Sequence, residues 1–511
     1  MQGSKEYRDI EKKIISEALR MHKSQKIIEA KKLYQKYLDM GFNDPKVLSN
    51  YGIICKQEGD IKKACLLFKT SISKYPSYPD AYINLGNLLI EQEKYIEAIL
   101  YTQEAIRLDE NNACAQNNYG TIMQKLNKHK QAEICFKKAI RLKANWELPY
   151  YNISTLYQDL GKLKEAEINA KLCLDINSDF AKCHYLLSTI NPLYLYNSFG
   201  ITLFSDGTKS NNKKKNLIYI NFAKANIMHS KENFKDSAKY LKIANSIKLD
   251  VYKSDCQYHL EKTEALLKKE HESISKQKEE KHNNLNIFIV GMPRSGSTLV
   301  ESILSLSKEV TALGEINIFE EAYLKWIDKD KNNDVALIDI YQEKISSLKI
   351  KTRATTNKWL YNYQYAGLIA KYFHNAKIIH CSRDPLDNIL SMYRANFDKG
   401  STYSSSIIDC AKVYLNQQEV MHYYKNKYSS QIYSLNYDQL VYSPRKHIKS
   451  LILWLKLDWD EAYLYPHLNK RLIKTASNVQ VRKPINSKSV DGWRNYEKML
   501  EPAIKFLENS R

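Results

Sequence analysis

Small residues recur every 34 positions in the N-terminal half of the chain. They form three columns: Gly52, Gly86, Gly120 and Ser154; Ala64, Ala98, Ala132 and Ala166; Ser71, Ala105, Ala139 and Cys173. A period of this length is typical of a helical pair repeated in tandem, with small residues where neighbouring helices cross closely. One such pair cannot bury its apolar face alone, so the pairs must stack. The period therefore predicts an α-helical solenoid, with clear repeats over about residues 45–182.

The repeat pattern weakens on both sides of this stretch. Ala30, 34 residues before Ala64, predicts a degenerate repeat ahead of Gly52, and residues 216–250 predict another helical pair out of clean register. The period and the small positions resemble the tetratricopeptide repeat, so we expect a repeat domain over residues 1–250. The concave face of such an array binds partners, often extended peptides, or only supports the next domain, and the sequence leaves both open.

Length, charge and cysteine content limit the class of protein. A chain of 511 residues is too long for one core, so two or three domains are expected. The formal charge of +21 suits anionic partners, or it reflects a lysine-rich background composition. No nucleic-acid-binding motif is present, so we expect no nucleic-acid partner. The nine cysteines form no CxxC pair and no zinc spacing, which indicates a reducing compartment and no metal site.

Neither the start of the chain nor its one uncharged segment predicts a membrane protein. The first twenty residues are charged throughout and do not resemble a signal peptide. Residues 183–205 carry no charged side chain, but they include His184, Asn191, Pro192 and Gly200. A spanning helix should be predominantly apolar, so we expect a buried helix followed by a loop, no membrane contact and a cytoplasmic protein.

The sequence changes character after residue 250. Residues 251–284 are highly charged and predict a helix that frays into a linker, and a new domain is expected over residues 285–511. Residues 286–290, NIFIV, predict a buried strand; the loop GMPRSGST follows, and then LVESILSLS at helical spacing. In such a unit, backbone N–H groups and a helix N-terminus bind phosphate. The unit predicts an α/β domain of the P-loop type with a central parallel sheet.

The loop lacks the lysine of a Walker motif. Gly291 and Gly296 have the right separation, but Ser297 stands at the lysine position, before Thr298. A helix dipole at an exposed end contributes only about 0.3–1 kcal/mol, which is too little to hold a multiply charged ligand without a fixed cation. Arg294, inside the loop, is the candidate cation. The missing lysine argues against ATP or GTP hydrolysis, and against a nucleotide kinase of the same fold class.

A second candidate anion site follows further along the chain. Residues 377–382, KIIHCS, predict a strand; Arg383 ends it, Asp384-Pro385 opens a helix, and Ser391 lies eight residues after the arginine. An arginine fork matches a phosphate, and the hydroxyl adds a donor. Together the two sites resemble those of sulfotransferases, which bind the 5′-phosphosulfate and the 3′-phosphate of 3′-phosphoadenosine 5′-phosphosulfate.

The C-terminal residues 475–500 resemble the loop that closes over the nucleotide in this family. Trp493 and Tyr496 fit the end of that loop in repeat-bearing sulfotransferases. The chain thus resembles a tetratricopeptide-repeat sulfotransferase over nearly its whole length, and its second domain is similar to protein-tyrosine sulfotransferases. The resemblance implies donor-binding roles for Arg294, Ser295, Gly296, Ser297, Thr298, Arg383, Ser391, Tyr437, Ser477, Gln480, Lys483 and Asn486.

Sulfuryl transfer needs a base for the acceptor proton, cations for the moving charge and in-line positioning. The resemblance implies that Glu315 is the base and that Lys358 stabilises the bridging oxygen and the sulfonate, without metal. A carboxylate in a partly dry pocket would have its pKa raised toward the working pH. A surface or helix-capping role for Glu315 stays open.

Three positions depart from the family pattern. Asn357 replaces the usual aspartate before the lysine, Leu360 replaces the usual proline after it, and Gly492 replaces a commonly basic residue. Arg394 is a candidate for the extra arginine that some members place near the serine. These changes bear on the acceptor pocket and the rate rather than on donor binding.

Histidine is the rival base, as in small-molecule sulfotransferases. His380 is the candidate, although its mid-strand position predicts a place in the core; His374 and His422 have no supporting pattern. We therefore expect a sulfotransferase whose acceptor hydroxyl belongs to tyrosine in a peptide or protein bound by the repeats, to a sugar or to a small metabolite. The alternative is a repeat scaffold that has lost activity but keeps its nucleotide site.

Overall fold

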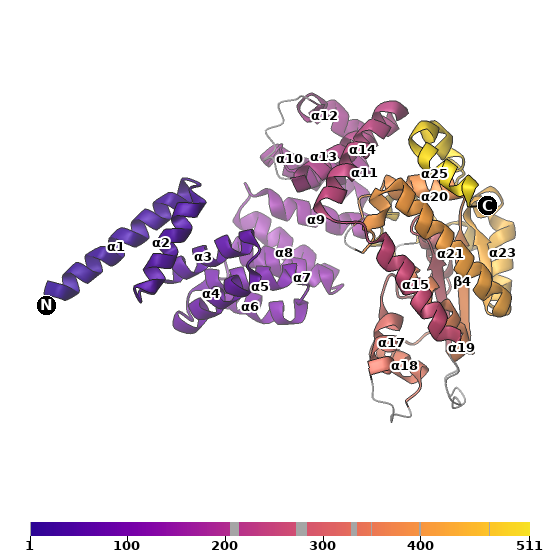
Figure 1. Cartoon of the computed structure of the whole chain (residues 1–511), viewed down its shortest axis with the longest axis horizontal. Coiled ribbons are helices and arrows are strands. Elements are labelled where there is room, and N and C mark those ends of the chain that lie inside the picture. The colour runs from indigo at the N-terminus through magenta and orange to yellow at the C-terminus, as the bar shows by residue number, and fades with distance from the viewer. Residues whose placement is uncertain are drawn as a thin grey trace. The chain divides into compact units, whose positions relative to one another are not determined.

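The computed structural model describes residues 2–204, 214–271, 284–328, 335–348, 350–397, 400–469 and 471–510. The chain forms two compact units (Figure 1). Unit 1 comprises Met1–Leu156 and Ile168–Asn177, and unit 2 comprises Tyr157–Glu167 and Ser178–Arg511. The fold class is as predicted: a helical repeat region precedes an α/β domain with a parallel sheet.

The repeat region is built from antiparallel helical pairs (Figure 1). Its helices are α1 (Gln2–Lys23), α2 (Ile27–Asp39), α3 (Pro45–Glu58), α4 (Ile61–Lys74), α5 (Pro79–Glu91), α6 (Tyr95–Leu108), α7 (Ala113–Lys125), α8 (His129–Leu142), α9 (Glu147–Asp159) and α10 (Leu163–Ile176).

The periodic small residues lie where the two helices of a pair touch. A Cβ added to Gly120 would lie 2.7 Å from the ring of Phe136, and one added to Gly86 would lie 2.7 Å from Oγ1 of Thr102. Ala98 and Ala132 are fully buried. Larger side chains at these positions would push the helices apart, which explains the 34-residue period.

The turns inside the pairs repeat as closely as the helices do. Five residues, each 34 apart, have a left-handed backbone: Gln25, Gly59, Glu93, Asn127 and Gly161. Only two of the five are glycine, so the turn itself tolerates a side chain.

The uncharged segment forms two helices instead of the predicted helix and loop. They are α11 (Ala181–Ile190) and α12 (Pro192–Phe204). Proline fits the first turn of a helix, where its missing N–H would be unpaired anyway, and the side chain of Asn191 accepts a hydrogen bond from the N–H of Tyr194. Across the part of the chain that the structure describes, no helix is long and apolar enough to span a bilayer.

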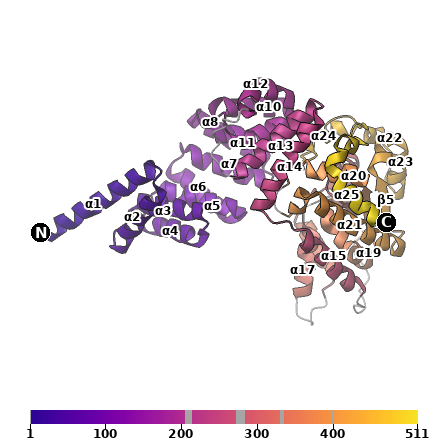
Figure 2. The same ribbon diagram turned by 45° about the horizontal axis from the view of Figure 1, so that its top comes forward.

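The predicted helical pair around residues 216–250 is present as α13 (Lys214–Ser230) and α14 (Phe234–Val251), but it packs with unit 2. Phe222 and Leu241 share an apolar core with Ile389 and Leu500 of the C-terminal domain. Figure 2 shows α13 and α14 beside α20 (Pro385–Tyr393) and α25 (Glu497–Asn509). The contacts therefore group these helices with the sheet, whereas the sequence placed them with the repeats. Their apolar faces are buried against the C-terminal helices, and no sequence pattern marks that choice.

Helix α15 (Cys256–His271) lies in the stretch predicted as helix and linker, and residues 272–283 of that stretch fall outside the described residues. Its inner face packs on the α/β domain: Leu266 joins the core, and Oγ1 of Thr263 accepts from Nε2 of Gln364 at 2.9 Å.

The sheet consists of five parallel strands in the order β2-β3-β1-β4-β5. They are β1 (Leu285–Gly291), β2 (Val310–Ala312), β3 (Ala354–Asn357), β4 (Ala376–Ser382) and β5 (Ile432–Asn436). The other α-helices of this domain are α16 (Ser297–Leu304), α17 (Ile318–Asp328), α18 (Leu337–Ser347), α19 (Ala366–Tyr372), α20 (Pro385–Tyr393), α21 (Ile407–Lys427), α22 (Tyr437–Tyr442), α23 (Pro444–Trp454), α24 (Asn478–Val481) and α25 (Glu497–Asn509). Short 3-10 helices are η1 (Leu360–Tyr365), η2 (Thr402–Ser405), η3 (Glu461–Leu464), η4 (Pro466–Leu468) and η5 (Gly492–Tyr496).

Both faces of the sheet are covered, as expected for a parallel sheet. Phe288 and Val290 of β1 pack on one face among residues of α17, α18, α19 and α21. Ile287 and Ile289 pack on the other face among residues of α16, α22 and α23. The continuous apolar run of β1 is the reason that the sequence predicted a buried strand.

Candidate functional site

The carboxyl ends of all five strands each supply one predicted site residue. Arg294 follows β1, Glu315 follows β2, Lys358 follows β3, Arg383 follows β4 and Tyr437 follows β5. Parallel strands bring these ends to one edge of the sheet. From β1 the chain continues toward β2 at one end of the sheet, and from β4 it continues to β5 at the opposite end. The carboxyl ends of the neighbouring strands β1 and β4 therefore form a topological switch point, which is where open α/β sheets bind ligands.

The loop after β1 is shaped by two glycines. Gly291 has φ 143°, and a Cβ there would overlap the carbonyl oxygen of Cys381. Gly296 has φ 90°, and a Cβ there would lie 2.5 Å from Cδ2 of Tyr437. Helix α16 then begins at Ser297, so its first N–H groups face the loop without intrahelical partners. This strand, glycine loop and helix start have the geometry expected for the anion site that the sequence predicted, and anion binding there stays a prediction.

Three predicted hydroxyl residues of the loop are buried. Ser295, Ser297 and Thr298 are each less than 5% exposed. The Oγ of Ser295 has no hydrogen-bond partner among the described residues, and Oγ1 of Thr298 lies 3.3 Å from Oγ1 of Thr475. A buried hydroxyl without a partner is costly, so Ser295 is suited to an incoming acceptor or donor group of a ligand.

Arg294 is held by three side chains from two distant segments. Its Nε donates to Oγ of Ser391 at 3.0 Å, Nη1 donates to Oγ of Ser477 at 2.5 Å, and Nη2 donates to Oε1 of Gln480. All three partners are neutral, and within the described ranges no carboxylate forms an ion pair with Arg294. The guanidinium charge is therefore left for a ligand.

Like charges surround this arginine. Burial, together with the positive charges of Arg383 and Arg394, lowers the pKa of Arg294 to about 10. Arginines gathered with little opposing charge are typical of a site for a multiply charged anion.

Arg383 is 7% exposed and reaches the same loop. Its Nη1 donates to the carbonyl of Arg294 at 3.3 Å, Nη2 donates to the carbonyl of Ser489, and its guanidinium carbon lies 4.9 Å from the ring centre of Tyr437. Its Nε makes no hydrogen bond to a described residue and is 3.9 Å from Oδ1 of Asp438. An unpaired N–H on a buried arginine fits a bound phosphate.

The two predicted catalytic residues meet. Nζ of Lys358 donates to Oε1 of Glu315 at 2.5 Å, and the backbone N–H of Lys358 donates to the carbonyl of Gly314 at 2.9 Å. The lysine side chain is 1% exposed, whereas the glutamate side chain is 39% exposed. The lysine side chain is thus buried, whereas the carboxylate of Glu315 is partly exposed to solvent. Glu315 is thus both exposed, as the surface alternative expected, and paired with Lys358, and its role as the base stays a prediction.

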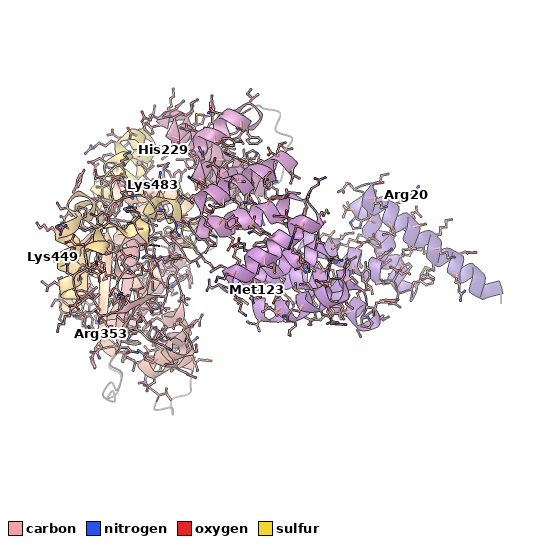
Figure 3. The ribbon with its side chains drawn as sticks, turned by 180° about the vertical axis from the view of Figure 1, so that it is seen from behind. Arg20, Met123, His229, Arg353, Lys449 and Lys483 are labelled. Carbon is pink, nitrogen blue, oxygen red and sulfur yellow. The ribbon has the colours of Figure 1, made fainter. Side chains whose placement is uncertain are left out.

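The structure brings together only part of the predicted C-terminal group. Ser477 and Gln480 contact Arg294, and Tyr437 lies beside Arg383 and Gly296. Lys483 and Asn486 have exposed side chains and no hydrogen bond to those residues (Figure 3 labels Lys483). Their donor-binding role stays a prediction.

Asn357, the first departure from the family pattern, fits its surroundings. Its Nδ2 donates to the carbonyl of Ile316 at 3.2 Å, and its Oδ1 accepts from the N–H of Trp359 and from Nδ2 of Asn362. A carboxylate could not donate to Ile316. Both the nitrogen and the oxygen of the Asn357 amide are therefore hydrogen-bonded, next to Lys358.

The other departures also fit locally. Leu360 begins η1 and is 9% exposed. A Cβ added to Gly492 would lie 3.7 Å from Oδ1 of Asp387, which is an ordinary contact. Arg394 lies 5.9 Å from the ring centre of Tyr496, and its burial lowers its pKa.

His380 is a core residue, as expected. It is 6% exposed, its Nε2 lies 2.8 Å from Nε2 of Gln417, and burial lowers its pKa to about 4. His374 and His422 are exposed. Glu315 therefore stays the better candidate base.

Sequence reasoning missed a buried carboxylate behind the site. Glu301 of α16 is 1% exposed; its Oε1 accepts from the N–H of Gly314 at 3.0 Å and from Oγ1 of Thr356 at 3.1 Å. Its Oε2 accepts from Nη1 of Arg471 at 2.9 Å. Glu301 thus ties the loop helix to the segments that carry Glu315 and Lys358. A single carboxylate inside the apolar run LVESIL was the available signal.

Asp387 was also missed. On α20 it accepts from the backbone N–H groups of Asp491 at 2.7 Å and Trp493 at 2.9 Å. Burial raises the pKa of this carboxyl. It anchors the end of the C-terminal loop to the helix that carries Ser391.

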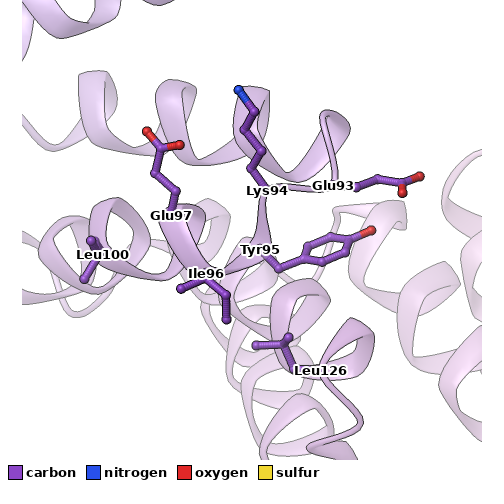
Figure 4. A pocket seen from close by; sticks show the side chains of 7 residues that line it. All are labelled: Glu93, Lys94, Tyr95, Ile96, Glu97, Leu100 and Leu126. Carbon is purple, nitrogen blue, oxygen red and sulfur yellow. The ribbon is translucent and has the colours of Figure 1, made fainter. Parts of the chain in front are cut away.

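A separate pocket of about 560 Å³ lies in unit 1 at the turn before α6 (Figure 4). It is lined by Glu93, Lys94, Tyr95, Ile96, Glu97, Leu100 and Leu126. None of the predicted site residues belongs to it.

Family models match both parts of the chain. The sulfotransferase family matches residues 286–461, and tetratricopeptide repeats match residues 79–112, 115–145 and 149–180. The sulfotransferase match contains Arg294, Glu315, Lys358, Arg383 and Tyr437.

Similar proteins cover only part of the chain. An uncharacterised protein of Aquifex aeolicus is 33% identical over 244 residues, which are 43% of this chain and 32% of that protein. Protein-tyrosine sulfotransferase 1 of Danio rerio is 25% identical over 233 residues, 40% of this chain and 65% of that protein. The protein-tyrosine sulfotransferase of Drosophila melanogaster is 23% identical over 40% of this chain and 46% of that protein. The chain thus spans less than two thirds of the length of each.

Among solved structures, a tetratricopeptide-repeat protein of Thermus thermophilus aligns with a TM-score of 0.32 and 18% identity, over 35% of this chain and 98% of that chain. A tetratricopeptide-repeat protein of Parabacteroides merdae aligns with a TM-score of 0.35 and 14% identity, over 46% of this chain and 93% of that chain. From the family matches, the chain carries tetratricopeptide repeats over residues 79–180 and a sulfotransferase-family domain, and it is distantly similar to protein-tyrosine sulfotransferases.

Proposed function

We propose that the protein transfers a sulfuryl group from 3′-phosphoadenosine 5′-phosphosulfate to the hydroxyl of a tyrosine in a peptide or protein. The observation that carries this proposal is Arg294. It lies in a glycine loop at the switch point, is fixed by Ser391, Ser477 and Gln480, and has no carboxylate partner in the described part of the chain. The sulfotransferase-family match over the same residues gives the reaction class.

The residues present fit such a donor. The glycine loop and the start of α16 supply N–H groups for the 5′-phosphosulfate, and Ser295 has a buried hydroxyl to spare. Arg383 and Ser391 would hold the 3′-phosphate, and the Nε of Arg383, which is ion-paired with Asp438 but makes no hydrogen bond to a described residue, supports that assignment. The donor supplies the activated sulfuryl group.

Glu315 and Lys358 would divide the chemistry between them. Glu315 takes the proton of the acceptor hydroxyl as its oxygen forms the new bond to sulfur. Lys358 donates hydrogen bonds to the oxygen that is released with adenosine 3′,5′-bisphosphate, so negative charge grows next to a buried cation. Their contact of 2.5 Å places the base and the cation side by side, the one for the entering oxygen and the other for the leaving oxygen. Because Glu315 is 39% exposed, a bound acceptor would have to complete the dry pocket around it.

The tyrosine acceptor is supported by the relatives, several of which are named protein-tyrosine sulfotransferases. The repeats support a peptide or protein acceptor, because a small metabolite has no need of an extended array. The rival hypothesis is a scaffold without activity. Glu315 and Lys358 are both present and paired, and the side-chain amide of Asn357 is hydrogen-bonded beside them, which favours the enzyme over the scaffold.

Calorimetric titration tests the proposal. Wild-type protein and Arg294→Ala are titrated with adenosine 3′,5′-bisphosphate and with ATP. We expect tight binding of the bisphosphate by the wild type only, since Arg294 is the loop cation. A preference for ATP would contradict the proposal, and bisphosphate binding without sulfuryl transfer to any tyrosine peptide would favour the scaffold.

A further inference from the structure

The equivalent turns of the repeats differ in what they touch. The residue at the left-handed position is Gln25, Gly59, Glu93, Asn127 or Gly161, with φ between 60° and 89° in every pair. Glutamine, glutamate and asparagine hold this conformation, so it does not by itself require glycine. A glycine here needs another explanation.

At Gly161 a neighbouring side chain excludes any residue larger than glycine, whereas at Gly59 there is no such neighbour. A Cβ added to Gly161 would overlap Cζ and Nε of Arg482 and would lie 2.6 Å from its Nη1. A Cβ added to Gly59 would meet nothing within 4 Å. The bare turn at residue 161 is therefore the surface on which the guanidinium of Arg482 lies. Both residues belong to unit 2.

Arg482 joins this turn to the C-terminal segment. Its Nη2 donates to the carbonyls of Asp159 at 3.2 Å and Arg471 at 2.9 Å, and its Nη1 donates to the carbonyl of Asn469 at 3.2 Å. The N–H of Ile473 also donates to the carbonyl of Asp159, at 3.1 Å. One guanidinium thus satisfies carbonyl groups of both stretches of chain.

The segment fixed in this way carries part of the candidate donor site. Ser477 and Gln480, which bond the guanidinium of Arg294, lie at the start of α24 and within it, and Arg482 directly follows that helix. Nε of Arg482 also contacts Oδ1 of Asn478 at 3.4 Å. A shift of Arg482 would therefore move the hydroxyl and the amide that orient Arg294.

We propose that Gly161 and Arg482 are positioning residues for the donor site: the turn of the α9–α10 pair holds the 471–483 segment so that Ser477 and Gln480 fix Arg294. This inference rests on the proposed function for the identity of the ligand. It adds a repeat turn, more than 130 residues before Arg294 in the sequence, to the machinery of the sulfotransferase-family domain.

The test compares four full-length variants with the wild type: Gly161→Ala, Arg482→Ala, the double variant and the matched control Gly59→Ala. The two glycine variants carry the same left-handed strain, so only the contact with Arg482 distinguishes them. Two readouts are taken. One is hydrogen exchange of backbone amides 471–483 without ligand, and the other is the affinity for adenosine 3′,5′-bisphosphate by calorimetry.

We expect Gly161→Ala and Arg482→Ala each to raise exchange in residues 471–483 and to weaken the bisphosphate about tenfold or more, since a displacement near 1 Å in a site has effects of that size. The double variant should match the single variants, because both remove one contact. Gly59→Ala should behave as the wild type.

Equal exchange in Gly161→Ala and Gly59→Ala would overturn the inference, as would additive losses in the double variant. If the wild type binds no bisphosphate, the proposed donor is wrong, while the exchange comparison still decides whether the turn positions the segment. Gly161→Ala keeps the test informative if Arg482→Ala fails to fold.

Discussion

At the scale of single residues, the site is a set of cations whose neighbours are mostly neutral. Arg294 is bonded to two hydroxyls and an amide, and the Nε of Arg383, near Asp438, makes no hydrogen bond to a described residue. The sequence predicted Arg294 as the cation inside the glycine loop, where the Walker lysine is missing, and Arg383 as the residue that ends a later strand and precedes a helix. It also predicted Glu315 and Lys358, through the family resemblance rather than through local pattern.

Glu315→Gln should reduce turnover by about 100-fold or more, since loss of a general base has effects of that order. The bisphosphate should bind as in the wild type, because the amide oxygen of the substituted side chain can still accept the hydrogen bond from Lys358. Sulfate transfer to a tyrosine peptide and calorimetry measure the two effects. Glu309→Gln, ahead of β2, is the control at the other end of the strand and should keep full activity. An active Glu315→Gln would mean that another group is the base.

Asn357→Asp, which restores the usual residue of the family, should destabilise this protein. The buried carboxylate could not donate to the carbonyl of Ile316, and an unpaired buried polar group costs about 1–3 kcal/mol. Urea unfolding at neutral pH measures the change. A variant as stable as the wild type would show that the loop relaxes around the carboxylate.

The residues that the sequence did not reveal act through others. Glu301 is bonded to Arg471, and Arg482 to the carbonyl of Asp159; both partners are more than 150 residues away, so no sequence spacing reveals these contacts. Lys483 and Asn486 show the opposite case, because their family positions match but their side chains are exposed.

At the scale of elements, α16 is both a phosphate-loop helix and a tether. Through Glu301 it is bonded to the residue before Glu315 and to Thr356, two residues before Lys358. The candidate donor loop and the proposed catalytic pair are thus connected by one carboxylate, which forms an ion pair with Arg471.

Glu301→Gln should cost about 3–5 kcal/mol of unfolding free energy, because it leaves Arg471 largely buried without its counter-ion. Glu309→Gln, which breaks an exposed pair with Arg353, should cost about 0–1 kcal/mol. Urea titrations of both variants give the comparison. Equal costs would argue against the tether.

Two largely buried histidines should make the sulfotransferase-family unit sensitive to acid. Burial lowers the pKa of His229 to about 3, with the charge of Arg394 adding to the effect, and lowers that of His380 to about 4. Below the ordinary histidine pKa the unfolded chain binds protons that the folded chain does not, so stability falls as pH drops through about 6.5. The loss should be about 2 kcal/mol per histidine at about pH 5.

His229→Gln tests this expectation. His229, which is labelled in Figure 3, lies on α13. Its Nδ1 is 2.8 Å from the hydroxyl of Tyr496. Unfolding free energies at pH 7.5 and pH 5 should differ less in the variant than in the wild type. An unchanged difference would mean that His229 is protonated in the folded protein.

Elements themselves were well predicted where the period is strict. The 34-residue columns predicted the helical pairs, and the apolar run of β1 predicted a buried strand. The uncharged segment formed α11 and α12 because Pro192 begins a second helix, where the sequence had suggested a loop. Proline is compatible both with the end of one helix and with the first turn of the next. Its presence at residue 192 therefore did not show whether a loop or a second helix follows.

At the scale of the whole molecule, the sequence predicted the order of a helical repeat region and an α/β domain. It did not reveal that α13 and α14 pack on α20 and α25. Periodicity shows that a helix has an apolar face, but it does not show which distant helix covers that face.

The proposed docking role of the repeats predicts a difference between acceptors. Deleting residues 2–142 should raise the KM for a long tyrosine peptide about tenfold or more, because a tethered contact raises the effective concentration of the acceptor. The kcat, and the KM for a small phenol, should change little. Steady-state kinetics with both acceptors measure this. An equal change for both would indicate that the repeats only support the fold.

The left-handed turns also bear on how such an array can change in length. Four of the five turn positions, up to and including Asn127, carry a side chain or face open space, so the local geometry of these turns places no further demand on the unit that supplies them. The unit with Gly161 differs, because Arg482 fits only a bare turn. We therefore expect a whole unit inserted before the Gly161 pair to be tolerated, and replacement of that pair by another unit to disturb the contact with Arg482.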